Sequence, residues 1–480
     1  MIEDRKTASI NLAKNTMILT IGMICTQGLG FLLLPLYTSV LDTNEYGVYD
    51  LLITYGMLLF PIVGGQFEQG LFRFMLDAQN DEERISELFS TVFVIDILHV
   101  VLYVIFGGII SVFYEIDYLP FLLIYVCMQV FYTLMQQFVR GLGKSSVYAI
   151  ANFLSAGLTI ILNVFFLVVV RMRLTGMFFS VTISYMVSIM YMCVCVQPWK
   201  YFNIEKIDKK TLHSIRKYSL PLIPNNLSWW VVNVSDRTII TYFLGLSFNG
   251  IYTVANKFSN VFITIYNVFN VSWTETVSLY YENEDRDVFL SDMITVMYRL
   301  FSSMCFGIVG FMPFIFPILV NSKYQKGYNQ VIILMYAMLL RVVVGLYSCI
   351  YVAMKDSGKI AVTSAMAAVI NILVNVMLIG KLGIYAASIS TFTAFGVMAV
   401  VRYLDINKTM NIRIEKKTLL SSGIIAGIML IGYYRKNKYV NVILLMIAVT
   451  YAVYMNKDLI KKVIQYIYEK MLFNSGNKSG

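Results

Sequence analysis

Charged residues are scarce in this chain of 480 residues. They make up 14% of the sequence, whereas hydrophobic residues make up 58% and the mean hydropathy is +0.69. An average soluble domain carries about 25% charged residues. The scarcity of charge therefore excludes an ordinary soluble protein and predicts a polytopic membrane protein. We expect it to be all-α, because the lipid core leaves no partner for an unpaired backbone.

Clusters of metal ligands and catalytic motifs are also lacking. The sequence has two histidines and six cysteines, and all six cysteines fall inside apolar stretches, where a disulfide framework or a zinc site is not expected. It has no nucleotide-binding loop or nucleophile motif. The basic residues are spread over short loops, which argues against a nucleic-acid surface. We therefore expect no cofactor, no metal, no nucleic-acid partner and no enzymatic activity.

Long apolar stretches recur along the whole chain. One helical crossing needs about 20 apolar residues, and on that measure the sequence predicts about fourteen transmembrane helices. The predicted spans are 15–41, 46–72, 88–114, 119–139, 146–170, 174–197, 218–244, 250–278, 293–320, 327–353, 360–380, 383–403, 418–434 and 439–456.

Basic residues in the connecting segments predict the orientation. They concentrate in Lys200–Lys217 and Arg402–Lys417, and short cytoplasmic loops are the ones enriched in lysine and arginine. An even number of spans places both termini on one side. We therefore expect a multi-pass membrane protein with both termini in the cytoplasm.

An internal repeat organises the predicted helices. Tyr46–Tyr49 recurs as Asn249–Tyr252, and Gly143–Ser145 recurs as Gly358–Ile360, at similar offsets and in the same order. Two parallel six-helix repeats around a central cavity are expected from this pattern, followed by two extra C-terminal helices. The predicted parts are an N-terminal bundle (1–200), a cytoplasmic linker (201–217), a C-terminal bundle (218–404), two extra transmembrane helices (405–456) and a cytoplasmic tail (457–480).

Four basic residues, Arg237, Lys257, Arg299 and Arg341, lie inside predicted spans. A charge at mid-bilayer costs about 2.5 to 3.5 kcal/mol on insertion scales, so such residues normally face water, a partner or an anion. Arg299 lies near the end of its span, where its side chain can extend to the interface. The other three predict a cationic cavity.

Polar residues follow one face of the span 250–278. Lys257, Asn260, Thr264 and Asn267 recur at steps of three and four, which places them on one helical face. Helix-to-helix hydrogen bonding is the alternative interpretation for the asparagines and threonine. The predicted substrate-binding residues are Arg237, Lys257, Arg341, Asn233, Asn260, Thr264 and Asn267.

Acidic residues inside the spans are candidates for ion coupling. Asp236, Glu68 and Glu275 could carry a proton or a sodium ion, and Asp96 is a further candidate. Each could instead pair with a base or lie near an interface. Asp236 most simply compensates the neighbouring Arg237.

Three stretches of the chain resemble a known family. Glu45–Tyr49, Phe138–Lys144 and Tyr218–Lys257 are similar to segments of the bacterial oligosaccharide flippases of O-antigen, capsule and related pathways. That family lies within the multidrug/oligosaccharidyl-lipid/polysaccharide exporter superfamily. The resemblance implies a substrate of undecaprenyl-diphosphate-linked oligosaccharide, moved by alternating access from the inner to the outer leaflet of the bacterial inner membrane. It also implies a polysaccharide polymerase and glycosyltransferases as candidate partners, besides the lipid bilayer.

Three alternatives stay open. Lipid II flippases are similar in architecture but are expected to carry an arginine in the first helix, and Asn15–Leu41 contains no charge. A multidrug cation antiporter of the same superfamily would favour acidic groups in its cavity. A membrane glycan polymerase would be expected to have a long external loop, whereas the external connections between the predicted spans are all short.

Overall fold

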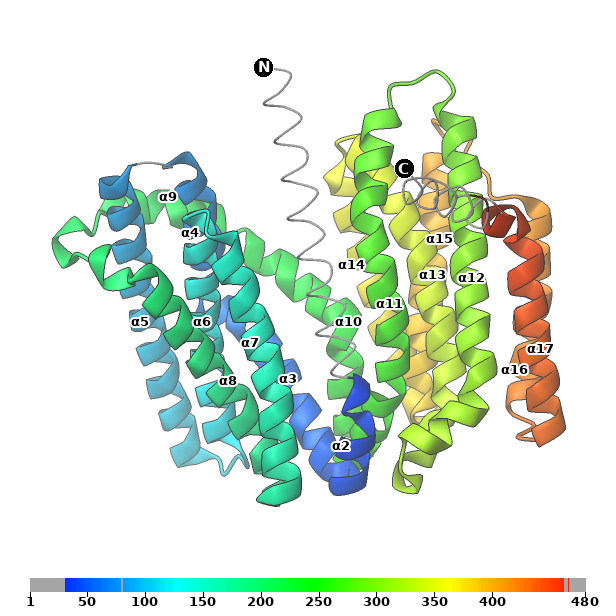
Figure 1. Ribbon diagram of the computed structural model, residues 1–480, viewed down its shortest axis with the longest axis horizontal. Helices are drawn as coiled ribbons and strands as arrows, with labels where there is room; N and C mark the ends of the chain where they lie inside the picture. Colours follow the sequence, from blue (N-terminus) through cyan, green and yellow to red (C-terminus); the bar gives the residue numbers. More distant parts are fainter. Residues whose placement is uncertain (1–30, 79–80, 462–464, 466–480) are drawn as a thin grey trace, which may run out of the picture. The chain divides into compact units, whose positions relative to one another are not determined.

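The computed structural model describes residues 31–78, 81–461 and 465, and nearly all of them are helical (Figure 1). No strand occurs among these residues. Ten of the helices are long and apolar enough to cross a membrane. The all-α, multi-pass architecture predicted from the sequence is thus confirmed.

The first compact unit extends to Thr253. It contains α2 (Leu34–Val40), α3 (Thr43–Val63), α4 (Phe67–Asp77), α5 (Glu82–Phe113), α6 (Leu119–Gly141), α7 (Ser145–Val164) with a short π-helical extension, α8 (Arg173–Val196), α9 (Lys209–Ser219) and α10 (Leu222–Leu244). We call this part unit 1.

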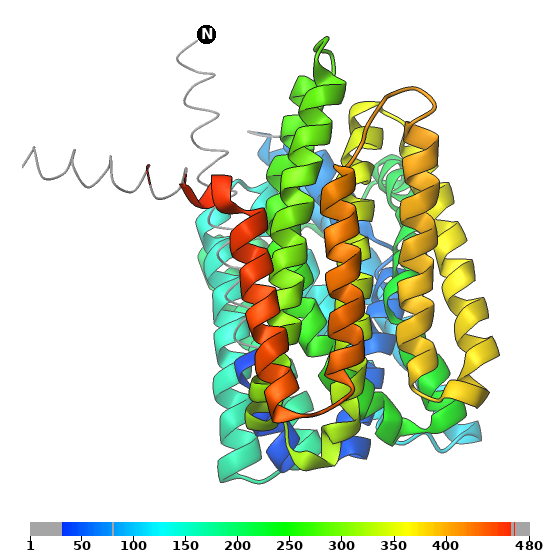
Figure 2. The same cartoon turned by 90° about the vertical axis from the view of Figure 1, so that its right-hand side faces the viewer.

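The second compact unit begins at Val254, within α11 (Leu246–Tyr280), whose first two turns belong to unit 1. It continues with α12 (Arg286–Leu319), α13 (Tyr328–Ala353), α14 (Ser357–Leu382), α15 (Tyr385–Ile406), α16 (Lys416–Tyr433) and α17 (Lys438–Met455). The last two helices lie side by side against α12 (Figure 2). We call this part unit 2.

Most predicted spans that lie wholly in the described residues coincide with one helix, and the span 218–244 includes the turn at Leu220 and Pro221 before α10. The structure describes the predicted span 15–41 only from residue 31 onward, and α2 forms the last part of this span. The predicted span 46–72 is interrupted: α3 ends at Val63, Gly65 and Gln66 adopt left-handed conformations, and α4 starts at Phe67. Pro61 lies in the last turn of α3, and proline and left-handed residues are both incompatible with a continuous helix.

Two glycines from the repeated sequence lie against each other in unit 1. A Cβ atom on Gly47 would fall 2.0 Å from the carbonyl oxygen of Leu246, and one on Gly250 would fall 2.0 Å from that of Thr43. Leu246 lies four residues before Gly250, and Thr43 lies four residues before Gly47, so the contact is reciprocal. Asn249 adds a hydrogen bond of 2.9 Å to the carbonyl oxygen of Gly47.

The segment between α8 and α10 runs over one end of unit 1. We call Gln197–Leu220, which includes α9, the strap. Asp208 caps α9 by accepting from the Thr211 backbone N–H at 2.7 Å. Since α9 contacts α4 and α5, and α10 contacts α3, this segment and α10 pack with the helices of unit 1.

Candidate functional site

Arg341 lies near the middle of α13 in unit 2. Its guanidinium carbon is 5.8 Å from the centroid of the Phe395 ring on α15, and the side chain is only partly exposed. Among the described residues, no carboxylate lies within ion-pair distance and no hydrogen-bond acceptor binds the guanidinium. Arg341 therefore keeps its hydrogen-bond donors available in an apolar setting.

One turn beyond Arg341, α13 and α11 approach each other closely. A Cβ atom on Gly345, one turn further along α13, would fall 2.1 Å from the hydroxyl oxygen of Tyr266 on α11. The Tyr266 hydroxyl donates to Asn270 Oδ1 at 2.7 Å. Glycine at this position thus lets a polar part of α11 approach the helix that carries Arg341.

A second arginine, Arg402 on α15, is buried in unit 2 with 1% of its surface exposed. Arg402 uses all five N–H donors of its guanidinium on neutral acceptors of α13 and α14. The acceptors are Thr363 Oγ1 at 3.0 Å, the Val344 carbonyl at 3.1 Å, Ser364 Oγ at 3.3 Å, the Ile360 carbonyl at 3.5 Å and Ser348 Oγ.

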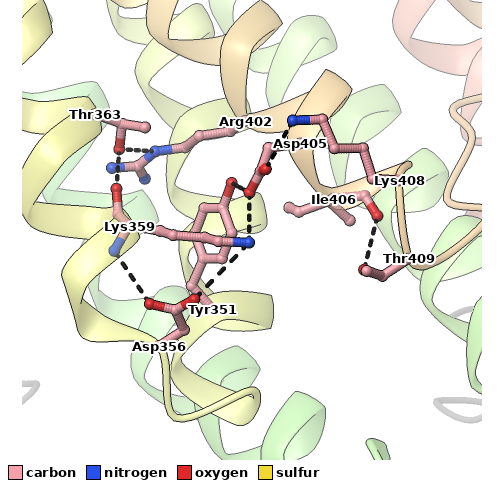
Figure 3. Close-up of polar contacts among 9 residues, drawn as sticks. All are labelled: Tyr351, Asp356, Lys359, Thr363, Arg402, Asp405, Ile406, Lys408 and Thr409. Carbon is pink, nitrogen blue, oxygen red and sulfur yellow. Dashed lines mark hydrogen bonds and ion pairs between the residues drawn. The ribbon is translucent and has the colours of Figure 1, made fainter.

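Asp405, the acidic residue closest to Arg402 along α15, binds other side chains. Asp405 pairs with Lys359 at 2.9 Å and accepts from the Tyr351 hydroxyl at 3.0 Å, as Figure 3 shows. Among the described residues, no carboxylate forms an ion pair with Arg402. All hydrogen-bond donors of Arg402 are therefore used within the protein, where they join α15 to α13 and α14. No donor is left for a ligand.

Arg402 was expected in a cytoplasmic segment, and its burial was not predicted. The signal was its position between apolar neighbours, Val400–Val401 on one side and Tyr403–Leu404 on the other. Arg299 has a partner as well: it pairs with Glu415 and donates to Thr418 Oγ1 at 2.9 Å. Hydrogen bonds from the Thr418 hydroxyl and then from the Arg299 guanidinium lower the pKa of the Glu415 carboxyl from its ordinary value.

The polar face predicted on α11 lies partly outside the core of unit 2. Asn260 and Asn267 are exposed, while Lys257 and Thr264 are partly buried. Thr264 Oγ1 donates to the Asn260 carbonyl at 2.8 Å. The opposite face carries buried residues, including Phe258, Phe262, Tyr266 and Trp273. Glu275, a predicted coupling residue, is exposed on α11.

Arg237 on α10 forms an ion pair of 2.6 Å with Asp50 on α3, within unit 1. Both side chains are largely buried. Asp236, which was expected to compensate Arg237, accepts from the Tyr252 hydroxyl at 2.6 Å. Asp50 was not predicted as a partner, although it is the acidic residue next to the repeated Tyr46–Tyr49 sequence. Asn233 also lies on α10, and its side chain is outside the described part of the chain.

A cavity of about 390 Å³ lies beside the break between α3 and α4 in unit 1. Glu68 is part of its lining and is 3% exposed, and Gln69 Nε2 donates to it at 3.4 Å. Asn226 on α10 donates to Gln66 Oε1 at 2.7 Å across the same lining. Among the described residues, no cationic group forms an ion pair with Glu68. The cavity therefore holds a buried carboxyl among neutral polar groups.

A second buried acidic residue, Asp96, lies on α5. Asp96 is 1% exposed, and its Oδ1 has no hydrogen-bond partner among the described residues. Its carboxyl lies near that of Glu68. His99, one turn further, stacks on Phe67 of α4 with ring centroids 5.5 Å apart. The helix break thus places two carboxyls and an imidazole in the same region of unit 1.

The predicted residues divide into two groups by unit. Arg341, Lys257, Asn260, Thr264, Asn267 and Glu275 belong to unit 2, and Arg237, Asn233, Asp236 and Glu68 belong to unit 1. No group of three or more histidine, cysteine or acidic side chains suited to a metal ion occurs in the described ranges. Unit 2 thus contains the Arg341 guanidinium, which has no acceptor among the described residues, and unit 1 contains carboxyls beside a cavity.

The family model for "Polysaccharide biosynthesis protein" matches residues 12–278. This match covers more than half of the sequence. The chain belongs to this family. None of the curated proteins searched matches it.

Solved structures show the fold. The chain is similar to "Lipid II flippase MurJ, inward closed conformation", with a TM-score of 0.71 and 13% identity over 94% of this chain and 100% of that one. It is also similar to an inward-facing multidrug resistance MATE family transporter of the MOP superfamily, with a TM-score of 0.61 and 15% identity over 80% and 96% of the chains. This member of the polysaccharide biosynthesis family thus has the fold of membrane transporters and flippases.

Proposed function

We propose that this protein is a flippase for undecaprenyl-diphosphate-linked oligosaccharide repeat units. It moves them by alternating access from the inner to the outer leaflet of the bacterial cytoplasmic membrane, for a surface polysaccharide of the O-antigen or capsule type. The polymerase and glycosyltransferases of that pathway are the proposed partners. The family match and the fold support a transport role in polysaccharide biosynthesis.

The availability of Arg341 carries this proposal. Arg402 is saturated, Arg299 is paired with Glu415, and Arg237 is paired with Asp50. Arg341 has no such partner among the described residues, so its planar guanidinium can bind a phosphate with two parallel hydrogen bonds. Lys257 and the polar residues Asn260, Thr264 and Asn267 of α11 are the other proposed substrate-binding residues of unit 2. Asn233 and Arg237 of α10, the latter paired with Asp50, are the proposed substrate-binding residues of unit 1 and the weaker candidates.

Glu68 is the favoured residue for ion coupling. It is buried beside the unit 1 cavity, whereas Glu275 is exposed and Asp236 already accepts from Tyr252. A carboxyl without a cationic partner can take up a proton and lose it as its surroundings change. Asp236 and Glu275 remain the weaker candidates.

A multidrug cation antiporter is the second candidate function. The observation that favours it is the same cavity, because Glu68 lines it and Asp96 lies near Glu68, and a buried acidic site attracts cations. A lipid II flippase shares the fold and would also need a site for a diphosphate.

The test is a flipping assay with purified protein in vesicles. The probe is an undecaprenyl-diphosphate oligosaccharide with a fluorophore on the sugar, bleached from outside by dithionite. We expect wild-type protein to move the probe and Arg341→Gln to slow it at least tenfold, since a hydrogen bond to a charged group contributes about 1.5 to 3 kcal/mol. Arg341→Lys should keep part of the rate, and Arg413→Gln, at an exposed arginine, should keep all of it.

Two results would contradict the proposal. A wild-type rate in Arg341→Gln would remove Arg341 from the site. Lack of any movement of the probe, together with efflux of an organic cation that depends on Glu68, would favour the antiporter instead.

A further inference from the structure

The strap at the end of unit 1 is basic. Its residues include six lysines and arginines against two acidic residues, Glu205 and Asp208, and Asp208 serves as the cap of α9. Most of the basic side chains are exposed; they are Lys200, Lys209, Lys210, Arg216 and Lys217.

Large apolar side chains are exposed beside these charges. Trp199 is 60% exposed and Ile204 is 68% exposed, although both belong to a segment that is otherwise well anchored. Phe202 and Tyr218 are also exposed. Tryptophan, tyrosine and basic residues together are typical of the zone between lipid tails and water.

Side chains of α5 hold the backbone of the strap in place. Ser86 Oγ donates to the Tyr201 carbonyl at 2.7 Å, and Asn203 N–H donates to Ser90 Oγ at 2.8 Å. Asp208 N–H donates to Thr91 Oγ1 at 3.3 Å. Because these bonds use the backbone of the strap, its exposed side chains are presented from a fixed support.

The helix α9 is fixed to the same unit. Arg84 Nη1 donates to Thr211 Oγ1 at 2.7 Å, and Thr211 also bonds to Glu87. A Cβ atom on Gly70 of α4 would fall 2.5 Å from Ser219 Oγ, so α9 lies directly on α4. The buried face of α9 is thus occupied by unit 1, and the basic face is left outside.

The strap lies where transmembrane helices end. It follows the last residue of α8, Val196, and precedes the first residue of α10, Leu222. Lys144, which precedes α7, donates to the Cys195 carbonyl at 3.3 Å and adds another cation at this end. A surface at the ends of transmembrane helices lies at the depth of the lipid headgroups.

We propose that the strap is a binding surface for the phosphate groups of anionic phospholipids in the cytoplasmic leaflet. The lysines and arginines bind the headgroup phosphates, while Trp199 and Ile204 enter the boundary between headgroups and tails. The occupant is an anionic rather than a zwitterionic lipid, because the excess of positive charge on the strap has no counterpart in a neutral headgroup. This site is separate from the proposed transport site and does not depend on the proposed function.

The test measures the thermal stability of the purified full-length protein in detergent. Phosphatidylglycerol and phosphatidylcholine are titrated separately into wild type and into a variant with Lys200, Lys209, Lys210, Arg216 and Lys217 all changed to glutamine. The control variant carries the same change at five exposed basic residues of unit 2: Lys408, Arg413, Lys416, Lys417 and Lys436.

We expect phosphatidylglycerol to raise the melting temperature of wild type and of the control variant more than phosphatidylcholine does. The strap variant should need at least tenfold more phosphatidylglycerol for the same shift, since one basic residue near an anionic surface contributes a factor of about five. An unchanged response of the strap variant would overturn the proposal. An equal response of wild type to inorganic phosphate would overturn the assignment to lipid.

A second measurement does not depend on the folding of the multiple variant. Wild type and Trp199→Phe are placed in vesicles that contain lipids brominated near the headgroup, which quench nearby tryptophan. We expect part of the quenching to disappear in Trp199→Phe. The same fractional quenching in both proteins would show that Trp199 is outside the lipid and would contradict the proposed surface.

Discussion

At the scale of single residues, the arginines of unit 2 divide by their hydrogen bonds and not by their position along the sequence. Arg402 has five neutral acceptors, while Arg341 has neither an acceptor nor a carboxylate partner in the described part of the chain. Burial of a charge is tolerated when every donor is satisfied. Arg402 therefore supports the helix bundle, and Arg341 is the residue that we propose for the ligand.

Arg402→Lys should destabilise unit 2. Lysine keeps the charge but has three donors in place of five, so at least two bonds to α13 or α14 are lost, at a cost of about 3 kcal/mol. The measurement is the melting temperature in detergent by fluorescence-detected size exclusion. Arg413→Lys is the control, because Arg413 is exposed. Equal melting temperatures for both variants would show that the bonds of Arg402 contribute little.

At the scale of elements, the reciprocal contact of Gly47 and Gly250 brings the start of α3 against the start of α11. The two glycines occupy equivalent positions in the repeated sequence, and α11 continues from this crossing into unit 2. The backbone atoms leave no space for a side chain at either glycine.

Gly47→Ala should cost about 3 kcal/mol of stability, because a methyl group 2.0 Å from the Leu246 carbonyl forces the backbones apart. Gly250→Ala should have a similar effect by the reciprocal contact. Gly108→Ala on α5 is the control: nothing lies within 4 Å of the new Cβ, and alanine favours helix by about 1 kcal/mol. Thermal melting of the three variants checks this, and an equally stable Gly47→Ala protein would refute the tight crossing.

The sequence predicted the long apolar helices of both units closely, but it did not predict α9, which lies in the polar linker. It did not predict the interruption at Gly64–Gln66, since the residues around it are still mostly apolar and the break depends on left-handed backbone at two consecutive positions. The cavity lined by Glu68 lies beside that interruption. The ion pair of Arg237 with Asp50 was also missed, because Asp50 is 187 positions away and only folding brings it near.

At the scale of the whole molecule, the two candidate functions predict different phenotypes for a deletion of the gene. A flippase should leave full-length lipid-linked repeat units in the inner leaflet and remove the surface polysaccharide. The measurement is extraction of both pools, with wild type and Arg341→Gln restored on a plasmid. Normal amounts of both pools, with increased sensitivity to cationic drugs, would favour the antiporter.

The sequence by itself determined that the chain is a helical membrane protein with a repeated plan, because hydropathy and spacing are local properties of the chain. It also identified Arg341, Lys257 and Glu68 as charged residues inside predicted spans. Which charge is satisfied and which is available was decided by the tertiary structure. The reason is physical: the acceptors of Arg402 and the partner of Arg237 come from other helices, and the state of a buried charge depends on the groups that folding places around it.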